Sequence, residues 1–400
     1  MKLAKRGSRV KKATSSVDSK EELALLREEV SFVTDSILKL VKKRQDLARK
    51  IAKVKAKRGL PIEDAFVEKT LKEDVKKQAS RLGLDSKIAL ELLEILLDAS
   101  KTVQRKELYE GRISSFLRSN KIWTVSVIGS GRMGGWFAGY FKSFGINVIL
   151  FDKRKNVAKK LARTLHCSFS DSINLLIEKS DLIVVAVPIS KTREQIENLQ
   201  KVFEKKEGQV RCKAIVEVSS IKTAVLQAGF EHLRVPLISI HPLFGASSQY
   251  YGKNTVAMIK LGGSPERDRY AVYFAKHLFP QFEVLAVGAE KHDEQMALKL
   301  TLPHSLALAF ADVIARNAGG WIREKKGITT SSYNTMREFA MKVLSENPAI
   351  YFEISSSNKF APKVLRELQM SISELSKALE HASMGDYLSL WERNRRSLGF

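Results

Sequence analysis

The stretch TVSVIGSGRMGGWFAGYF at residues 124–141 constrains the fold more than any other part of this 400-residue chain. An apolar strand pattern leads into Gly129, Gly131 and Gly134, and a helical pattern follows at once. Glycines at this spacing allow a tight turn, close approach of a phosphate to the backbone, and close packing of the helix on the strand. The stretch therefore predicts the first strand of an α/β sheet, with an anion site at the N-terminus of the following helix.

An acidic residue follows at the distance expected for a dinucleotide site. Asp152 ends the next apolar segment, NVILFD, about 20 residues beyond Gly129. A carboxylate there hydrogen-bonds the ribose hydroxyls and repels a 2′-phosphate, which favours NAD over NADP. Lys153 and Arg154 leave NADP open as an alternative. The predicted cofactor-binding residues are Gly129, Ser130, Gly131, Arg132, Met133, Gly134, Asp152, Val187 and Pro188.

Further apolar segments between residues 121 and 288 predict the rest of this domain. DLIVVAVP, KAIVEVS, LISIHP and TVAMIK read as buried strands, and helical stretches such as KTREQIENLQKVFEKK separate them. Continuous apolar strands with intervening helices are typical of a parallel sheet that is covered on both faces. We therefore predict a Rossmann dinucleotide-binding domain over 121–288.

Helical patterns on both sides of the sheet predict a multidomain protein. The segment 19–118 reads as an all-α domain whose first helix, about 19–57, is too long for a small compact monomer. It is expected to pair with another chain. Residues 289–400 predict an all-α domain for substrate binding and dimerisation. The basic segment 1–18 has no apolar pattern, and we expect a disordered lead-in there.

The composition narrows the class of protein. Lys and Arg (68) outnumber Asp and Glu (44), giving a net charge of +24 that suits small dianionic substrates. Nucleic-acid binding is an alternative, although the basic runs are not interleaved with aromatic residues. We find no apolar run of about 18–20 residues that would span a membrane. With two cysteines and no ligand-like spacing, we expect a cytoplasmic protein without a metal site.

Two polar residues follow the predicted strands at the edge where ligands bind. His241 lies in ISIHPLFG, and Ser220 in VEVSSIK ends the preceding strand. The combination of SSIK, HPLFG, KHDEQ…LPH and ENPAIY, over roughly 123–395, resembles the prephenate dehydrogenase family. The resemblance implies NAD-dependent oxidative decarboxylation of prephenate to 4-hydroxyphenylpyruvate, with arogenate as an alternative substrate.

The resemblance also implies roles for individual residues. His241 would take the proton of the substrate hydroxyl, and Ser220 would fix its tautomer or bind the same hydroxyl. His304 would line the substrate site, whereas we interpret His292 as structural. The family usually has a carboxylate-binding arginine six residues before the proline of its D-P or N-P turn. This chain has Lys342 there, and Arg337, five residues earlier, is the other candidate.

The N-terminal helices resemble the all-α chorismate mutase family over residues 20–110. The spacing of Arg44 and Lys55 is close to three helical turns, so they share a face, whereas Arg27 points elsewhere. The family mechanism is a one-step rearrangement that needs conformer selection and charge stabilisation but no proton transfer. The resemblance places the following residues in the site: Arg44, Lys55, Asp64, Glu68, Ser100, Gln104 and, from a second chain, Arg27.

In more detail, Arg44 and the partner's Arg27 would bind carboxylates, and Lys55 and Gln104 would face the ether oxygen. Glu68 would lie by the substrate hydroxyl. Val67 departs from the family, which commonly has an arginine just before this glutamate. The two resemblances together imply a bifunctional enzyme of tyrosine synthesis that forms a homodimer with intertwined N-terminal helices. In the alternative, the N-terminal domain is a regulatory or dimerisation module without mutase activity.

Overall fold

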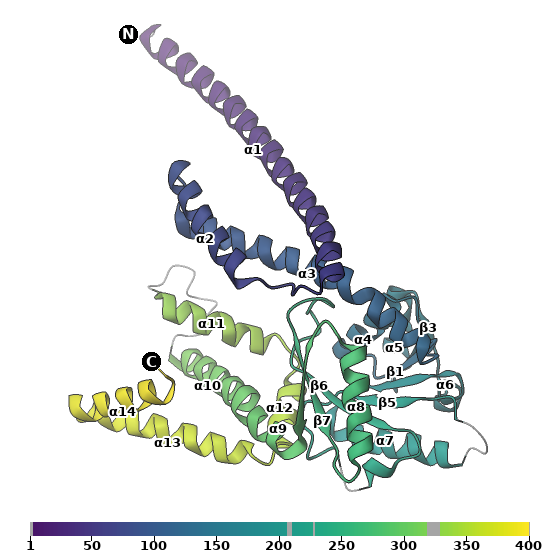
Figure 1. Ribbon diagram of the computed structural model, residues 1–400. Helices are drawn as coiled ribbons and strands as arrows, with labels where there is room; N and C mark the ends of the chain where they lie inside the picture. The colour runs from purple at the N-terminus through teal and green to yellow at the C-terminus, as the bar shows by residue number, and fades with distance from the viewer. Residues whose placement is uncertain (1–2, 206–209, 227–228, 318–328, 400) are drawn as a thin grey trace. The chain divides into compact units, whose positions relative to one another are not determined.

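The computed structural model describes residues 3–205, 210–226, 229–317 and 329–399, with side chains described from residue 21 onward (Figure 1). The chain divides into two compact units. One contains residues up to Arg112 together with Tyr251–Lys253, and the other contains Ile113–Tyr250 and the chain from Asn254 onward. The first unit is helical, and the second joins the sheet to the C-terminal helices.

Three helices build the N-terminal unit: α1 (Leu3–Arg58), α2 (Ala65–Arg81) and α3 (Ser86–Ser119). Helix α1 begins at Leu3, within the segment 1–18 for which we expected a disordered lead-in. Lysine, alanine and arginine, which recur in that segment, are good helix formers. The α1–α2 turn has Gly59 in the left-handed region, with φ +65°. The Asp64 carboxylate then caps α2 by accepting the Val67 N–H at 3.1 Å.

The second unit is built on a sheet of eight strands within the described residues, ordered β3-β2-β1-β4-β5-β6-β7-β8. The β1-to-β6 part has the strand order typical of a Rossmann fold. The strands are β1 (Thr124–Ile128), β2 (Asn147–Phe151), β3 (Ser168–Phe169), β4 (Leu182–Val185), β5 (Ala214–Glu217), β6 (Leu237–Pro242), β7 (Thr255–Lys260) and β8 (Glu283–Gly288).

The sheet differs from the prediction in two ways. Strands β6 and β7 pair antiparallel, so the expectation of an all-parallel sheet was wrong. The connection between them, residues 243–254, is a loop rather than a helix, and antiparallel neighbours need no crossover helix. Strands β3 and β8 lie at the two edges of the sheet and were not predicted. Strand β3 has only two residues, and β8 has a short apolar run but is largely exposed.

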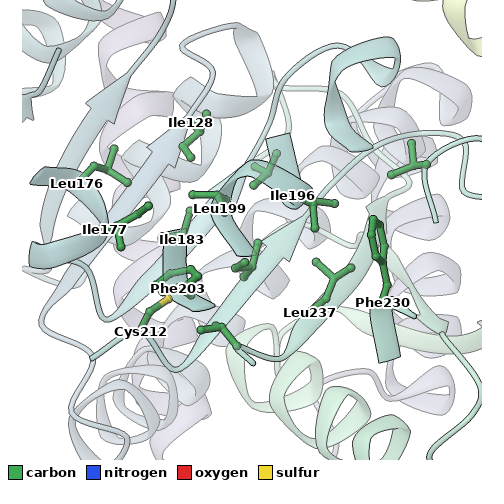
Figure 2. Packing of buried hydrophobic residues seen from close by; sticks show 14 residues of the cluster. Ile128, Leu176, Ile177, Ile183, Ile196, Leu199, Phe203, Cys212, Phe230 and Leu237 are labelled. Atoms are coloured by element: carbon green, nitrogen blue, oxygen red, sulfur yellow. The ribbon is translucent and has the colours of Figure 1, made fainter. Parts of the chain in front are cut away.

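Helices cover both faces of the sheet, as predicted. Ile183, Val185 and Ile215 pack with Leu199 and Phe203 of α7 in one apolar core (Figure 2). On strand β1, Ile128 belongs to this core. The adjacent Val127 faces the opposite way, toward Gly134 of α4. The helices around the sheet are α4 (Arg132–Lys142), α5 (Lys155–Leu165), α6 (Ile173–Lys179), α7 (Ile189–Glu204) and α8 (Pro265–Leu278), with a 3-10 turn η1 at Phe230–His232.

The C-terminal part is helical, as predicted, and α10 lies beside α11 and α13 (Figure 1). Its elements are α9 (Ala289–Met296), the π-helical turn η2 (Ala297–Thr301), α10 (Leu302–Asn317), α11 (Ser331–Leu344), α12 (Pro348–Ser356), α13 (Ala361–Glu380) and α14 (Met384–Ser397).

Within Ala289–Asn317, an 18-residue window is apolar enough to cross a membrane by length and composition, with a mean hydropathy of 1.3. The expectation that no such segment exists was therefore wrong. The first turns of this run, however, bury His292 and Asp293 in hydrogen bonds to the sheet domain. Buried, hydrogen-bonded titratable groups are not expected on the lipid-facing surface of a membrane span.

Candidate active sites

The glycine loop between β1 and α4 has the geometry needed for close approach of a phosphate. Gly129 has φ +99°, and a Cβ there would lie 2.3 Å from the Ala186 carbonyl oxygen. A Cβ at Gly134 would lie 1.8 Å from the Gly129 carbonyl oxygen. Beside Gly131, in contrast, nothing lies within 4 Å of a Cβ. The loop is thus closed toward the protein and open where a phosphate would sit.

The remaining predicted cofactor residues lie around this loop. The Asp152 carboxylate accepts the Ser130 N–H at 2.8 Å and the Arg154 N–H at 2.8 Å, which ties the loop to the end of β2. Val187 and Pro188 follow β4, the neighbour of β1 in the sheet. No side chain caps α4, so its first N–H groups are available to an anion. The Ser130 hydroxyl is buried without a hydrogen-bond partner. These features fit a dinucleotide.

His241 lies within β6 and is almost fully buried, with 5% of its surface exposed. Its Nδ1 lies 3.0 Å from Nε2 of His292, and Nδ1 of His292 lies 2.8 Å from an oxygen of Asp293. Burial, followed by the nearby His292 and Lys222, places the pKa of His241 well below its usual 6.5. The sheet therefore holds a neutral imidazole at the end of a His–His–Asp relay.

The carboxylate of this relay is held on several sides. It accepts the Lys222 backbone N–H at 2.9 Å and, at 2.7 Å, both the backbone N–H and the hydroxyl of Thr223. Burial alone would raise the pKa of Asp293, but hydrogen bonds from His292 and Thr223 outweigh it and the pKa is lowered. Asn358 also donates to the Asp293 backbone carbonyl at 2.8 Å. Asp293 is therefore an ionised, acceptor-only group fixed between α9 and the loop after β5.

A buried ion pair, Lys222–Glu217, stabilises the part of the sheet that carries this relay. The Lys222 ammonium donates to Glu217 at 2.5 Å and to the Ile240 carbonyl at 2.8 Å, with both charged side chains fully buried. Burial lowers the pKa of Lys222, and Glu217 partly offsets that effect. The Ser219 hydroxyl donates to the same carboxylate at 2.7 Å. Because Ile240 precedes His241, this network holds the strand that carries the imidazole.

The predicted substrate residues of this unit have varied surroundings. Among the described residues no hydrogen bond joins Ser220 to His241, whose ring contacts His292 instead. The ring of His304 packs against Tyr351 with 4.2 Å between centroids, and its buried Nδ1 has no partner. Burial lowers the pKa of His304. These observations describe a partly desolvated histidine close to the start of α12.

The two candidates for carboxylate binding lie on α11. Lys342 is exposed near the end of that helix, and Arg337 is half-buried one to two turns earlier. Arg132, predicted for cofactor binding, forms an ion pair with Glu346 of the α11–α12 turn. The pKa of Tyr351 is raised by its burial and by Glu346, and Arg132 opposes this. A guanidinium of the glycine loop thus lies near the ring that packs on His304.

The N-terminal unit brings most of its predicted residues together. The Arg44 guanidinium donates to the Ser100 hydroxyl and to the Leu96 carbonyl, which places α1 against α3. Partial burial lowers the pKa of Arg44. The Lys55 ammonium donates to the Ile62 carbonyl at 2.6 Å. Gln104, one turn beyond Ser100, is buried and its side-chain oxygen has no partner. Residues of α1 and α3 thus form a polar cluster.

Two cations of this cluster were missed by the sequence reasoning. Lys101 donates to Glu68 at 2.9 Å, and Arg105 donates to Glu63 at 2.8 Å. Both follow polar residues that were singled out, Ser100 and Gln104, and their spacing of four along α3 was a usable signal. Asp293 was also missed, although it directly follows His292, which the sequence analysis had named, on α9.

Arg27 lies apart from this cluster. It is exposed on α1, more than four turns before Arg44. Exposed apolar side chains surround it on the same helix, among them Leu23, Leu26, Val30 and Val33.

Comparison with known families assigns each unit. Residues 26–105 match the model described as chorismate mutase type II. Residues 137–256 match the prephenate dehydrogenase nucleotide-binding domain, and residues 288–392 match the prephenate dehydrogenase dimerization domain. The glycine loop lies directly before the second of these ranges.

Individual relatives agree with this division. The T-protein of Enterobacter agglomerans is 22% identical over 94% of this chain and 93% of its own length. The chorismate mutase of Methanocaldococcus jannaschii is 31% identical over 22% of this chain and 91% of its own length. A probable arogenate/prephenate dehydrogenase from the same archaeon is 24% identical over 69% of this chain, and the match spans 61% of that relative's length.

Solved structures share the fold of the second unit. The prephenate dehydrogenase from Aquifex aeolicus in complex with hydroxyphenyl propionate and NAD+ has a TM-score of 0.53 and 16% identity, covering 69% of this chain and 98% of that one. The Synechocystis arogenate dehydrogenase has a TM-score of 0.50 and 17% identity, covering 69% and 99%. The chain therefore belongs to the chorismate mutase and prephenate dehydrogenase families, as a bifunctional enzyme of tyrosine biosynthesis.

Proposed function

We propose that the N-terminal unit rearranges chorismate to prephenate and that the second unit oxidises and decarboxylates prephenate to 4-hydroxyphenylpyruvate with NAD+. The chemistry of the two units follows from different groups. The first presents fixed cations and hydrogen-bond donors, and the second presents a neutral buried base beside a nucleotide loop.

In the mutase unit, Arg44 and Lys55 select the compact conformer of the dianion by binding its carboxylate and ether oxygens. Gln104 donates to the ether oxygen as negative charge develops there, and Ser100 orients Arg44. Asp64 and Glu68, one turn apart on α2, lie by the substrate hydroxyl. No proton is transferred, so the site acts by position and charge alone.

In the dehydrogenase unit, the glycine loop holds the dinucleotide. The residues from Gly129 to Gly134 face the pyrophosphate, Asp152 faces the ribose hydroxyls, and Val187 and Pro188 form the wall after β4. Bound NAD+ would accept the hydride that leaves the substrate. Asp152 favours NAD over NADP, since its carboxylate repels a 2′-phosphate.

The observation that carries the proposal is the chain of contacts from Asp293 through both ring nitrogens of His292 to Nδ1 of His241. Ionised Asp293 can only accept, so Nδ1 of His292 carries a proton. With one proton on each ring, Nε2 of His292 accepts from Nδ1 of His241. Nε2 of His241 is then unprotonated and takes the proton of the substrate hydroxyl. Asp293 stabilises the positive charge that results.

The remaining predicted residues bind substrate. Ser220 and His304 contact the ring hydroxyl or carboxylate, and Arg337 or Lys342 binds a carboxylate. Lys342 keeps the charge of the family's arginine but not its two-pronged geometry.

We infer a homodimer for the whole enzyme. Helix α1 exposes a row of apolar side chains that a second copy would cover, with Arg27 from that copy entering the mutase site. Within Ala289–Asn317, an 18-residue apolar window is only 17% buried and offers a further interface. We also infer a cytoplasmic location, since Cys167 and Cys212 are both free thiols.

A coupled assay tests the proposal. Purified protein with chorismate and NAD+ should form NADH and 4-hydroxyphenylpyruvate, and prephenate alone should support the second step. Replacing NAD+ by NADP+ should lower kcat/KM. NADH formation from arogenate but not from prephenate would overturn the substrate assignment, and prephenate turnover without chorismate turnover would reduce the first unit to a regulatory or dimerisation module.

A further inference from the structure

The mutase site lacks one cation at the start of α2. Val67 is 56% exposed and has no polar atom, whereas the family commonly has an arginine there. Glu68 then lies next to a dianionic substrate without the neighbouring positive charge. Repulsion between the Glu68 carboxylate and the dianion would weaken substrate binding. A compensating cation is therefore expected near Glu68.

Lys101 of α3 occupies that position. Its ammonium lies 2.9 Å from both carboxylate oxygens of Glu68. The two side chains are only 17% and 25% exposed, so the pair is more shielded from water than Lys72–Glu94, which also joins α2 to α3. Lys101 directly follows Ser100 and lies one turn before Gln104, the two polar residues of the site on α3.

We propose that Lys101 replaces the missing arginine as a positioning residue of the mutase site. It offsets the negative charge of Glu68 beside the dianion and holds that carboxylate toward the substrate hydroxyl. This inference rests on the mutase activity proposed above.

Lys72 and Glu94 supply a matched control. They also join α2 to α3, with the ammonium 2.5 Å from the carboxylate, but their side chains are 43% and 53% exposed. A hydrogen bond and the charge of Glu94 raise the pKa of Lys72. Neither residue is among the predicted site residues. Loss of this pair therefore measures the structural value of an α2–α3 ion pair.

The experiment compares Lys101→Met and Lys72→Met in the full-length protein. We expect Lys101→Met to lower kcat/KM for chorismate about tenfold to a hundredfold, mainly through a higher KM, as for loss of a charged hydrogen bond. Lys72→Met should stay within about twofold of the original protein. Both variants should keep prephenate turnover and helical circular dichroism, which verifies folding.

A second variant tests the replacement itself. Adding Val67→Arg to Lys101→Met should restore a large part of kcat/KM, since the guanidinium again lies beside Glu68. Equal mutase kinetics for the Lys101 and Lys72 variants, or no rescue by the arginine, would overturn the inference. The unaltered protein is assayed with chorismate before any variant is made. If it leaves chorismate unchanged, the proposed mutase activity is wrong, and that outcome is distinct from a failure of the Lys101 inference.

Discussion

The two units of this enzyme differ in how deeply the key side chains of their proposed sites are buried. The mutase cluster places Arg44, Lys55 and Lys101 in partly exposed positions on its helices. The proposed dehydrogenase base, His241, lies in a strand of the sheet and is kept neutral by burial. A rearrangement needs a fixed electric field, whereas an oxidation needs a group that accepts a proton. The comparison shows why one site is made of long cations and the other of imidazoles.

Removal of the base should have the largest effect and should separate the units most clearly. His241→Asn keeps a polar side chain but cannot act as a base, so kcat for prephenate should fall about a thousandfold. Chorismate turnover should be unchanged, because Arg44 and its neighbours are in the other unit. Steady-state kinetics with each substrate measure both values. Retention of more than a tenth of the dehydrogenase rate would show that His241 is not the base.

Removal of a mutase cation gives the converse result. Arg44→Ala removes the donor to Ser100 and to the substrate, and chorismate kcat/KM should fall a few hundredfold. Prephenate oxidation should persist. Lys42→Ala, on the same helix, removes an exposed ion pair with Asp46 and is the control. A mutase rate equally insensitive to both changes would show that Arg44 does not bind the substrate.

A neutral replacement of the relay carboxylate should have an intermediate effect. Asp293→Asn leaves the shape but lets His292 adopt the other tautomer, which removes the hydrogen-bond order that leaves Nε2 of His241 free. We expect a fall in kcat of about tenfold to a hundredfold with little change in KM for prephenate. A normal kcat at neutral pH would show that the relay does not set the tautomer.

The smallest expected effect is the pH dependence of the dehydrogenase rate and of folding stability. The pKa of His241 is below 6.5 in the folded protein, so the acid limb of dehydrogenase kcat/KM should lie below pH 6.5, while the mutase rate changes little there. Folding stability changes with pH in the same direction as the dehydrogenase rate. The unfolded chain binds a proton at pH 6.5 that the folded unit does not, so the unit loses stability as pH falls below that value. Rate profiles and thermal unfolding from pH 5 to 8 measure both. An acid limb above pH 6.5 would contradict the burial argument.

Much of the architecture could be predicted from local pattern. The glycine loop, six of the strands and the three N-terminal helices have signals within a few residues of each other, because strand and helix periodicity is local. The antiparallel β6–β7 pairing could not be predicted in that way. Which strand pairs with which, and in what direction, depends on how the connecting loop packs. The edge strand β3 is only two residues long and β8 is largely exposed, so neither is buried like a central strand.

The candidate site residues divide in the same way, into those that a local pattern positions and those that only contacts between elements position. Arg44, Lys55, Ser100 and Gln104 were accessible from the sequence because their helical spacing places them on defined faces.

By itself, the sequence determined that this chain has a nucleotide loop, a strand with a histidine near its end, and helices whose cations fall at regular spacing. Only the tertiary structure decided that His241 meets His292 and that Lys101 meets Glu68. These partners lie on different elements, and no periodicity encodes a contact between elements. Such contacts arise when apolar faces pack and leave the polar groups between them to find one another, and that is where the charge and tautomer of each site are set.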